Sequence, residues 1–81
     1  MNIYTVADNL RITIAGKERY LVEVRTARCI ADRMEDIALH AVQKLLEINI
    51  DELKKILADV EVCCNQYSEM GWALNPERMG Q

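Results

Sequence analysis

Phenylalanine is absent from this chain of 81 residues, which has one proline, three glycines, one tryptophan and one histidine. So little glycine and proline leaves little material for long loops. The core must then come from aliphatic side chains and three tyrosines. Hydrophobic residues make up 51% and charged residues 28%, which excludes the composition of a disordered chain. The sequence therefore predicts one small folded domain over residues 1–81.

Motifs of catalysis are also missing: the chain has no glycine-rich phosphate loop, no GxSxG and no HExxH. Cys29, Cys63 and Cys64 form no CxxC, and adjacent cysteines on a helix diverge by about 100°, so they make poor metal ligands with His40. An odd cysteine count is a poor disulfide framework and favours reduced thiols. The first ten residues lack the pattern of a signal peptide. We expect a cytoplasmic protein with no enzyme activity, cofactor or metal.

Charge is divided unevenly along the chain, although the net charge is only −3. Residues 10–33 carry six bases and three acids, whereas residues 34–77 carry three lysines and nine acids. One interpretation is that basic and acidic elements attract each other within the fold. The other is association with an oppositely charged protein surface or with a second copy of the chain.

Residues 10–25 alternate between apolar and polar side chains, a pattern that predicts a β-hairpin. The apolar side chains of one face are Leu10, Ile12, Ile14, Tyr20, Val22 and Val24. The predicted strands cover residues 10–14 and 20–25. An odd-numbered loop around Gly16 joins them, because only such a loop places both apolar sets on one face. Residues 3–6 are a candidate third strand.

The apolar spacing then becomes helical and predicts a first helix over about residues 27–46, with Thr26 as its N-cap. Its apolar stripe consists of Ile30, Met34, Ile37, Ala41 and Leu45, widened by Ala31, Ala38, Val42 and Leu46.

A second helix is predicted over about residues 50–70, opened by a capping box of Asn49 and Glu52. Its apolar stripe consists of Leu53, Ile56, Leu57, Val60, Cys64, Tyr67 and Met70. A link of only residues 47–49 predicts that the two helices pack as an antiparallel hairpin. A tail over residues 71–81 follows. The predicted fold is therefore α+β: a β-hairpin followed by a helical hairpin.

Several side chains fall outside these predicted stripes and are candidates for partner binding. They are Leu21, Asp59, Glu61, Val62, Trp72 and Leu74. The apolar members give more apolar area than a small two-layer core needs. Either Trp72 folds back to cap the core, or the excess serves self-association or a partner. Asp59 and Glu61 belong to a solvated face or to an acidic docking face.

The segment LRITIAGKERYLVEV at residues 10–24, a following helix and the segment NIDEL at residues 49–53 resemble small phage tail assembly chaperones of Gram-positive and gene-transfer-agent type. The resemblance covers about residues 10–57. It implies a non-enzymatic protein that binds the tape-measure protein or tail-tube components during assembly, and it transfers no individual functional residue.

We therefore predict a non-enzymatic protein-binding module that forms homo-oligomers in the cytoplasm of a bacterial host, with a tape-measure or tail component as its client. The alternative is a small acidic inhibitor or adaptor from a mobile element that blocks a basic site on a target protein. A further alternative is a nucleic-acid-binding regulator that uses the arginines of the hairpin, against which the acidity of the chain argues. No membrane partner is expected, because no apolar run approaches the roughly 18 residues of a span.

Overall fold

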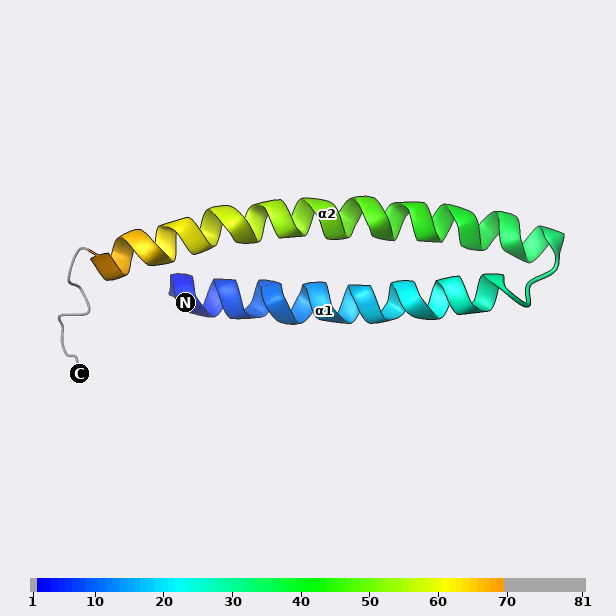
Figure 1. Cartoon of the computed structure of the whole chain (residues 1–81), viewed down its shortest axis with the longest axis horizontal. Coiled ribbons are helices and arrows are strands. Elements are labelled where there is room, and N and C mark those ends of the chain that lie inside the picture. The colour runs from blue at the N-terminus through cyan, green and yellow to red at the C-terminus, as the bar shows by residue number, and fades with distance from the viewer. Residues whose placement is uncertain (1, 70–81) are drawn as a thin grey trace.

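The computed structural model describes residues 2–69, and almost all of them lie in two long helices (Figure 1). Helix α1 covers Ile3–Arg28 and helix α2 covers Arg33–Glu69. A link of residues 29–32 turns the chain, so the helices run antiparallel along their whole contact. Helix α2 has 37 residues against 26 in α1 and extends beyond the start of α1. The fold is an all-helical hairpin.

The predicted β-hairpin is therefore wrong, because residues 2–69 contain no strand. Residues 10–14 and 20–25, and the candidate strand over 3–6, all belong to α1. The apolar residues over 10–25 that alternate as in a strand overlap with a second pattern, which has helical spacing and extends over the whole of α1. Eight positions separated alternately by four and three residues are all buried or half-buried, and we call them the α1 seam: Ile3, Ala7, Leu10, Ile14, Lys17, Leu21, Val24 and Arg28.

The ends of the helices differ from the predicted ends. Asn2 caps α1, because its side chain accepts a hydrogen bond from the backbone N–H of Thr5 at 2.9 Å. Thr26 is not an N-cap: it lies in the last turn of α1, where its hydroxyl donates to the carbonyl oxygen of Val22 at 2.9 Å. The first helix thus starts before residue 27.

Helix α2 opens with a capping box of Asp32 and Glu35, not with the predicted one of Asn49 and Glu52. The backbone N–H of Glu35 donates to the Asp32 carboxylate at 2.8 Å, and the N–H of Asp32 donates to the Glu35 carboxylate at 3.1 Å. The predicted box of Asn49 and Glu52 lies in the middle of α2, and the predicted link over residues 47–49 is helical. No glycine or proline there interrupts the backbone hydrogen bonds, so the helix continues.

The core is a thin strip between the two helices. Its buried members are Ile14, Leu21, Val24, Leu46 and Ile50, with Leu39, Val42, Leu53 and Leu57 packed against them. Ala7 is also buried, near the open end, where the Tyr4 hydroxyl donates to the Cys64 carbonyl oxygen at 3.5 Å. No described side chain is excluded from solvent completely. A two-helix core of this size leaves most of the surface of each helix uncovered.

Ion pairs along one edge of the core fix how the helices align. They join Arg11 to Glu61 at 3.0 Å, Glu18 to Lys54 at 2.9 Å and Arg25 to Glu47 at 3.3 Å. The partners step by seven residues on each helix, and the sign alternates from one pair to the next. A shift of one heptad in either direction would place acid against acid and base against base. Because these pairs are partly exposed, each contributes at most about 1 kcal/mol, and their main effect is to select this register.

These pairs also bear on the charge pattern of the sequence, because they show basic and acidic elements attracting each other within the fold. Arg11 and Arg25 of the basic first half contact carboxylates of the acidic second half within the same hairpin. Much of the charge asymmetry of the sequence is therefore neutralised inside the fold.

Candidate functional site

Helix α2 carries apolar side chains on two separate faces. One face, which includes Leu46, Ile50 and Leu57, packs against α1. The second face lies about 140° around the helix axis from the first, since each residue turns an α-helix by about 100°. We call it the α2 stripe, and its members are Met34, Ile37, Ala41, Leu45 and Ile48.

The α2 stripe faces solvent along its whole length. Its large members have exposed fractions of 77% for Met34, 62% for Ile37, 69% for Leu45 and 58% for Ile48. Fully burying one such side chain is worth about 1.5–3 kcal/mol, so leaving four of them in water on one face forgoes several kcal/mol of stabilisation. Monomeric proteins rarely leave such a contiguous apolar surface unused.

The apolar surface continues from the stripe to the turn between the helices. Ile30 is 88% exposed, the highest fraction among the exposed large apolar side chains. Beside it lies a shallow hollow formed by both helices and the link, whose lining residues are Ala27, Ile30, Ala31, Glu35, Ala38 and Leu39. The turn end of the hairpin and the first half of α2 thus form one apolar surface.

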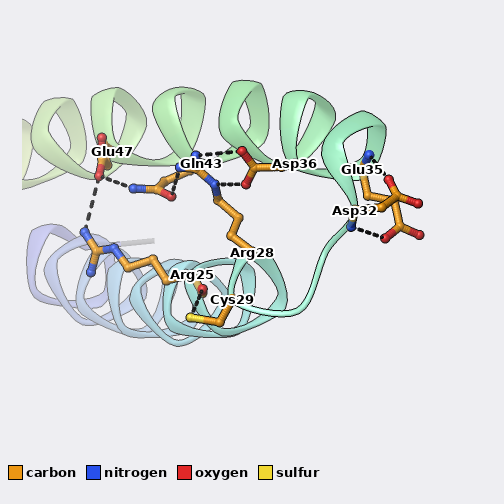
Figure 2. A network of polar contacts seen from close by, with 8 residues as sticks. All are labelled: Arg25, Arg28, Cys29, Asp32, Glu35, Asp36, Gln43 and Glu47. Carbon is orange, nitrogen blue, oxygen red and sulfur yellow. Dashed lines mark hydrogen bonds and ion pairs between the residues drawn. The ribbon is translucent and has the colours of Figure 1, made fainter.

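A network of polar contacts holds the turn end together (Figure 2). The guanidinium of Arg28 donates to both carboxylate oxygens of Asp36, at 2.7 and 3.2 Å, and to the side-chain oxygen of Gln43 at 2.8 Å. The Gln43 amide donates to Glu47 at 3.1 Å, and Glu47 also accepts from Arg25 at 3.3 Å. The paired fork of Arg28 and Asp36 is the geometry in which such pairs are strongest. The network joins the last turns of α1 to the first four turns of α2.

The network shifts the titration of both carboxylates. The hydrogen bond from Arg28 lowers the pKa of Asp36 below its ordinary value of 3.8. The Gln43 amide, and then the Arg25 guanidinium, lower the pKa of Glu47 below its ordinary value of 4.5. In both cases the hydrogen bonds favour the charged form of the carboxyl group.

These shifts predict an acid-sensitive hairpin. A carboxyl with a lower pKa in the folded state than in the unfolded state stabilises the fold at every pH above its unfolded value. That stabilisation is lost as the pH falls from about 4.5 through the lowered folded values. We expect the free energy of unfolding, measured by urea titration at a series of pH values and one protein concentration, to fall as the pH drops below about 4.5.

The variant Asp36→Asn removes one of the two titrating groups, so its free energy of unfolding should fall less steeply with acid than that of the parent chain. Glu23→Gln is the matched control, because Glu23 is exposed on α1 and has no ion pair among the described residues. Its pH profile should run parallel to that of the parent chain. A profile for Asp36→Asn that also runs parallel to the parent would contradict the role given to the Arg28–Asp36 pair.

Of the residues predicted to bind partners, the four in the described part of the chain do not form one surface. Leu21 is only 7% exposed and belongs to the core, because it lies on the α1 seam. Glu61 is in the ion pair with Arg11, whereas Asp59 and Val62 are exposed near the open end. Trp72, Leu74 and the tail over residues 71–81 lie outside the described residues.

The α2 stripe was visible in the sequence, but its role was not. The helical spacing predicted an apolar stripe containing Met34, Ile37 and Leu45, which the predicted fold placed in its core. In the structure the neighbouring residues Val42 and Leu46 face α1 instead. Ile48 belongs to the same stripe, but the prediction placed it in the link over residues 47–49. The signal that could have found the exposed face is that the apolar surface of this helix is wider than one partner helix can cover.

The described part of the chain has neither a cluster of metal ligands nor a membrane-spanning helix. In residues 2–69, no three side chains of histidine, cysteine, aspartate or glutamate come together as metal ligands. Cys29, Cys63 and Cys64 are free thiols, and the first two are exposed. Neither described helix has the length and hydropathy needed to cross a membrane.

Comparisons with known proteins return no relative from which a role could be transferred: no family model, curated protein or solved structure matches the chain.

Proposed function

We propose that this chain is a non-enzymatic protein-binding module that acts through the α2 stripe. The observation that carries the proposal is the position of this stripe, which consists of apolar side chains like the core-facing side of α2 but is exposed to solvent. An apolar helix face of this kind docks against a complementary helix or groove. The proposal places the protein in the cytoplasm, where its three thiols stay reduced.

The charges of the hairpin favour this proposal over the two alternatives. Four arginines would have to contact phosphates in a nucleic-acid-binding protein, and three of them, Arg11, Arg25 and Arg28, are each in an ion pair with a carboxylate of α2. The fourth, Arg19, is exposed. Glu61, part of the acidic face of the proposed inhibitor, is one of those carboxylates. The ion pairs thus already engage much of the charge on which the two alternatives depend.

The resemblance to tail assembly chaperones stays a prediction. It depended in part on a β-hairpin over residues 10–25, and these residues are helical. A tape-measure or tail component is therefore one candidate partner for the stripe. No residue of the helical hairpin favours this partner over another protein.

Site-specific cross-linking in cells that make the protein tests the proposal. A photo-reactive amino acid replaces Leu45 on the stripe, and in a matched control it replaces Thr13, which is exposed on α1. We expect protein adducts of defined mass at Leu45 that are absent at Thr13. The same adducts from both positions, or none from Leu45, would overturn the proposal.

A further inference from the structure

The spacing of the α2 stripe is symmetric. From Met34 to Ile48 the intervals between its members are three, four, four and three residues, so the stripe reads the same from either end. When two identical helices pack antiparallel about a two-fold axis, a residue before the axis faces the residue equally far after it. With the axis at Ala41, Met34 faces Ile48 of the second copy, and Ile37 faces Leu45.

The residue at the centre of this symmetry is the smallest in the stripe. Ala41 would face Ala41 of the second copy, at the point where the two helix axes come closest. The distance between packed helices depends on the side chains at the contact, so an alanine there lets the axes approach and the larger pairs on both sides interdigitate. Ala38, which is also small and exposed, lies about one turn before Ala41 and lengthens the region in which the two helices can approach closely.

We propose that the α2 stripe binds a second copy of this chain, antiparallel and with the two-fold axis at Ala41. The inference rests on the proposed function, in which the stripe is the binding face, and it names the occupant. Two α2 helices would then lie at the centre of a four-helix assembly, each still covered on its other face by its own α1.

Charges beside the stripe agree with this arrangement. Arg33 and Asp51 are 18 residues apart, which is five helical turns, so both lie on the same side of the stripe. The two-fold axis brings Arg33 to within about two residues of Asp51 of the second copy, roughly 3 Å along the helix. Glu52, which ends the apolar run, comes within about one turn of the same arginine. A parallel arrangement would instead align Arg33 with Arg33, Lys44 with Lys44 and Asp51 with Asp51.

The arrangement is also closed. The exposed large apolar side chains of α1 do not form a second stripe. Tyr4, Ile12 and Tyr20 are separated by eight residues each and so turn about 80° around the helix at each step, and Val22 lies about 160° around the helix from Tyr20. A two-fold pair would cover the stripes of both copies, and the described part of α1 offers no second stripe to which a third copy could add.

Sedimentation of the purified full chain over a range of concentrations tests the proposal. We expect the mass of two chains, and we expect Ile37→Glu to raise the dissociation constant by at least about thirtyfold, since a charge would be buried at a central contact. Ile12→Glu is the matched control, because Ile12 is 71% exposed on α1 and lies outside the stripe. It should leave the dimer unchanged, and circular dichroism should show that both variants remain helical.

Disulfide trapping tests the position of the axis. In a chain with Cys29, Cys63 and Cys64 replaced by serine, Ala41→Cys should form a cross-linked dimer under mild oxidation, because its thiol meets its own counterpart on the axis. Ala15→Cys, at an exposed position of α1, should not.

A chain that is monomeric at every concentration, a dimer that Ile37→Glu does not weaken, or equal trapping at both cysteines would overturn the proposal. The photo-reactive group at Leu45 separates its failure from that of the proposed function. Adducts with a different protein would refute the second copy as the occupant but leave the stripe as the binding face. The absence of any adduct would refute both proposals.

Discussion

Ile14→Ala should lower the free energy of unfolding by about 2–3 kcal/mol, because it removes a buried aliphatic side chain from the core. Ile14 is 6% exposed and contacts the core cluster between the two helices. A chain of this length has a total stability of only about 4–12 kcal/mol, so the loss is a large share of it. Urea unfolding followed by circular dichroism, at one protein concentration, measures the change.

Ile12→Ala is the matched control for this prediction, and it separates the two folds that the sequence allows. In the predicted β-hairpin Ile12 and Ile14 share one face, so both substitutions would be costly. In α1 Ile12 is 71% exposed. Its replacement should change the free energy of unfolding by no more than about 0.5 kcal/mol. Similar losses from both substitutions would contradict the helical assignment of residues 10–14.

Gly16→Pro should destabilise the hairpin by about 3 kcal/mol or more, the largest effect we expect from a surface position. Gly16 lies in the interior of α1, where a proline removes a backbone hydrogen bond and its ring clashes with the preceding turn. Helix content and the urea midpoint should both fall.

Gly16→Ala is the companion variant and should have the opposite sign. A Cβ atom at Gly16 would meet no atom within 4 Å, so the added methyl group meets no steric obstacle. Alanine restricts the unfolded chain and favours the helix, and the expected gain is about 0.5–1 kcal/mol. Had Gly16 formed the turn of a β-hairpin, alanine would be neutral or harmful. A loss of stability on Gly16→Ala would therefore refute the helix at this position.

The error over residues 10–25 has a specific physical origin. Leu10, Ile12 and Ile14 satisfy the period of a strand, but Leu10 and Ile14 are also one helical turn apart. The helical pattern becomes clear only over the whole of α1, and a lysine at position 17 interrupts its apolar character. Helix formation is cooperative. The α1 seam, which extends over a helix of 26 residues and packs against α2, therefore prevails over an alternating pattern of only five residues.

The boundary between the helices was misplaced for a related reason. Asp32 with Glu35 and Asn49 with Glu52 have the same spacing and chemistry, so the sequence offers two capping boxes. Only the first is used. Turning at residues 29–32 lets α2 run past the full length of α1, and the Arg28–Asp36 pair then secures the turn. A turn at residues 47–49 would give up the contacts of Leu46 and Ile50 with α1.

The sequence by itself determined that the chain contains a helical hairpin, that residues 34–45 carry an apolar stripe with helical spacing and that charges of opposite sign predominate in its two halves. All of these are properties of composition and spacing along one element. Only the tertiary structure decided which apolar face is covered. Leu46 and the α2 stripe are equally apolar, and the alignment of α1, set by its seam and by the alternating ion pairs, buries the first and leaves the second in solvent. That choice depends on contacts between residues far apart in the chain, which no local pattern encodes.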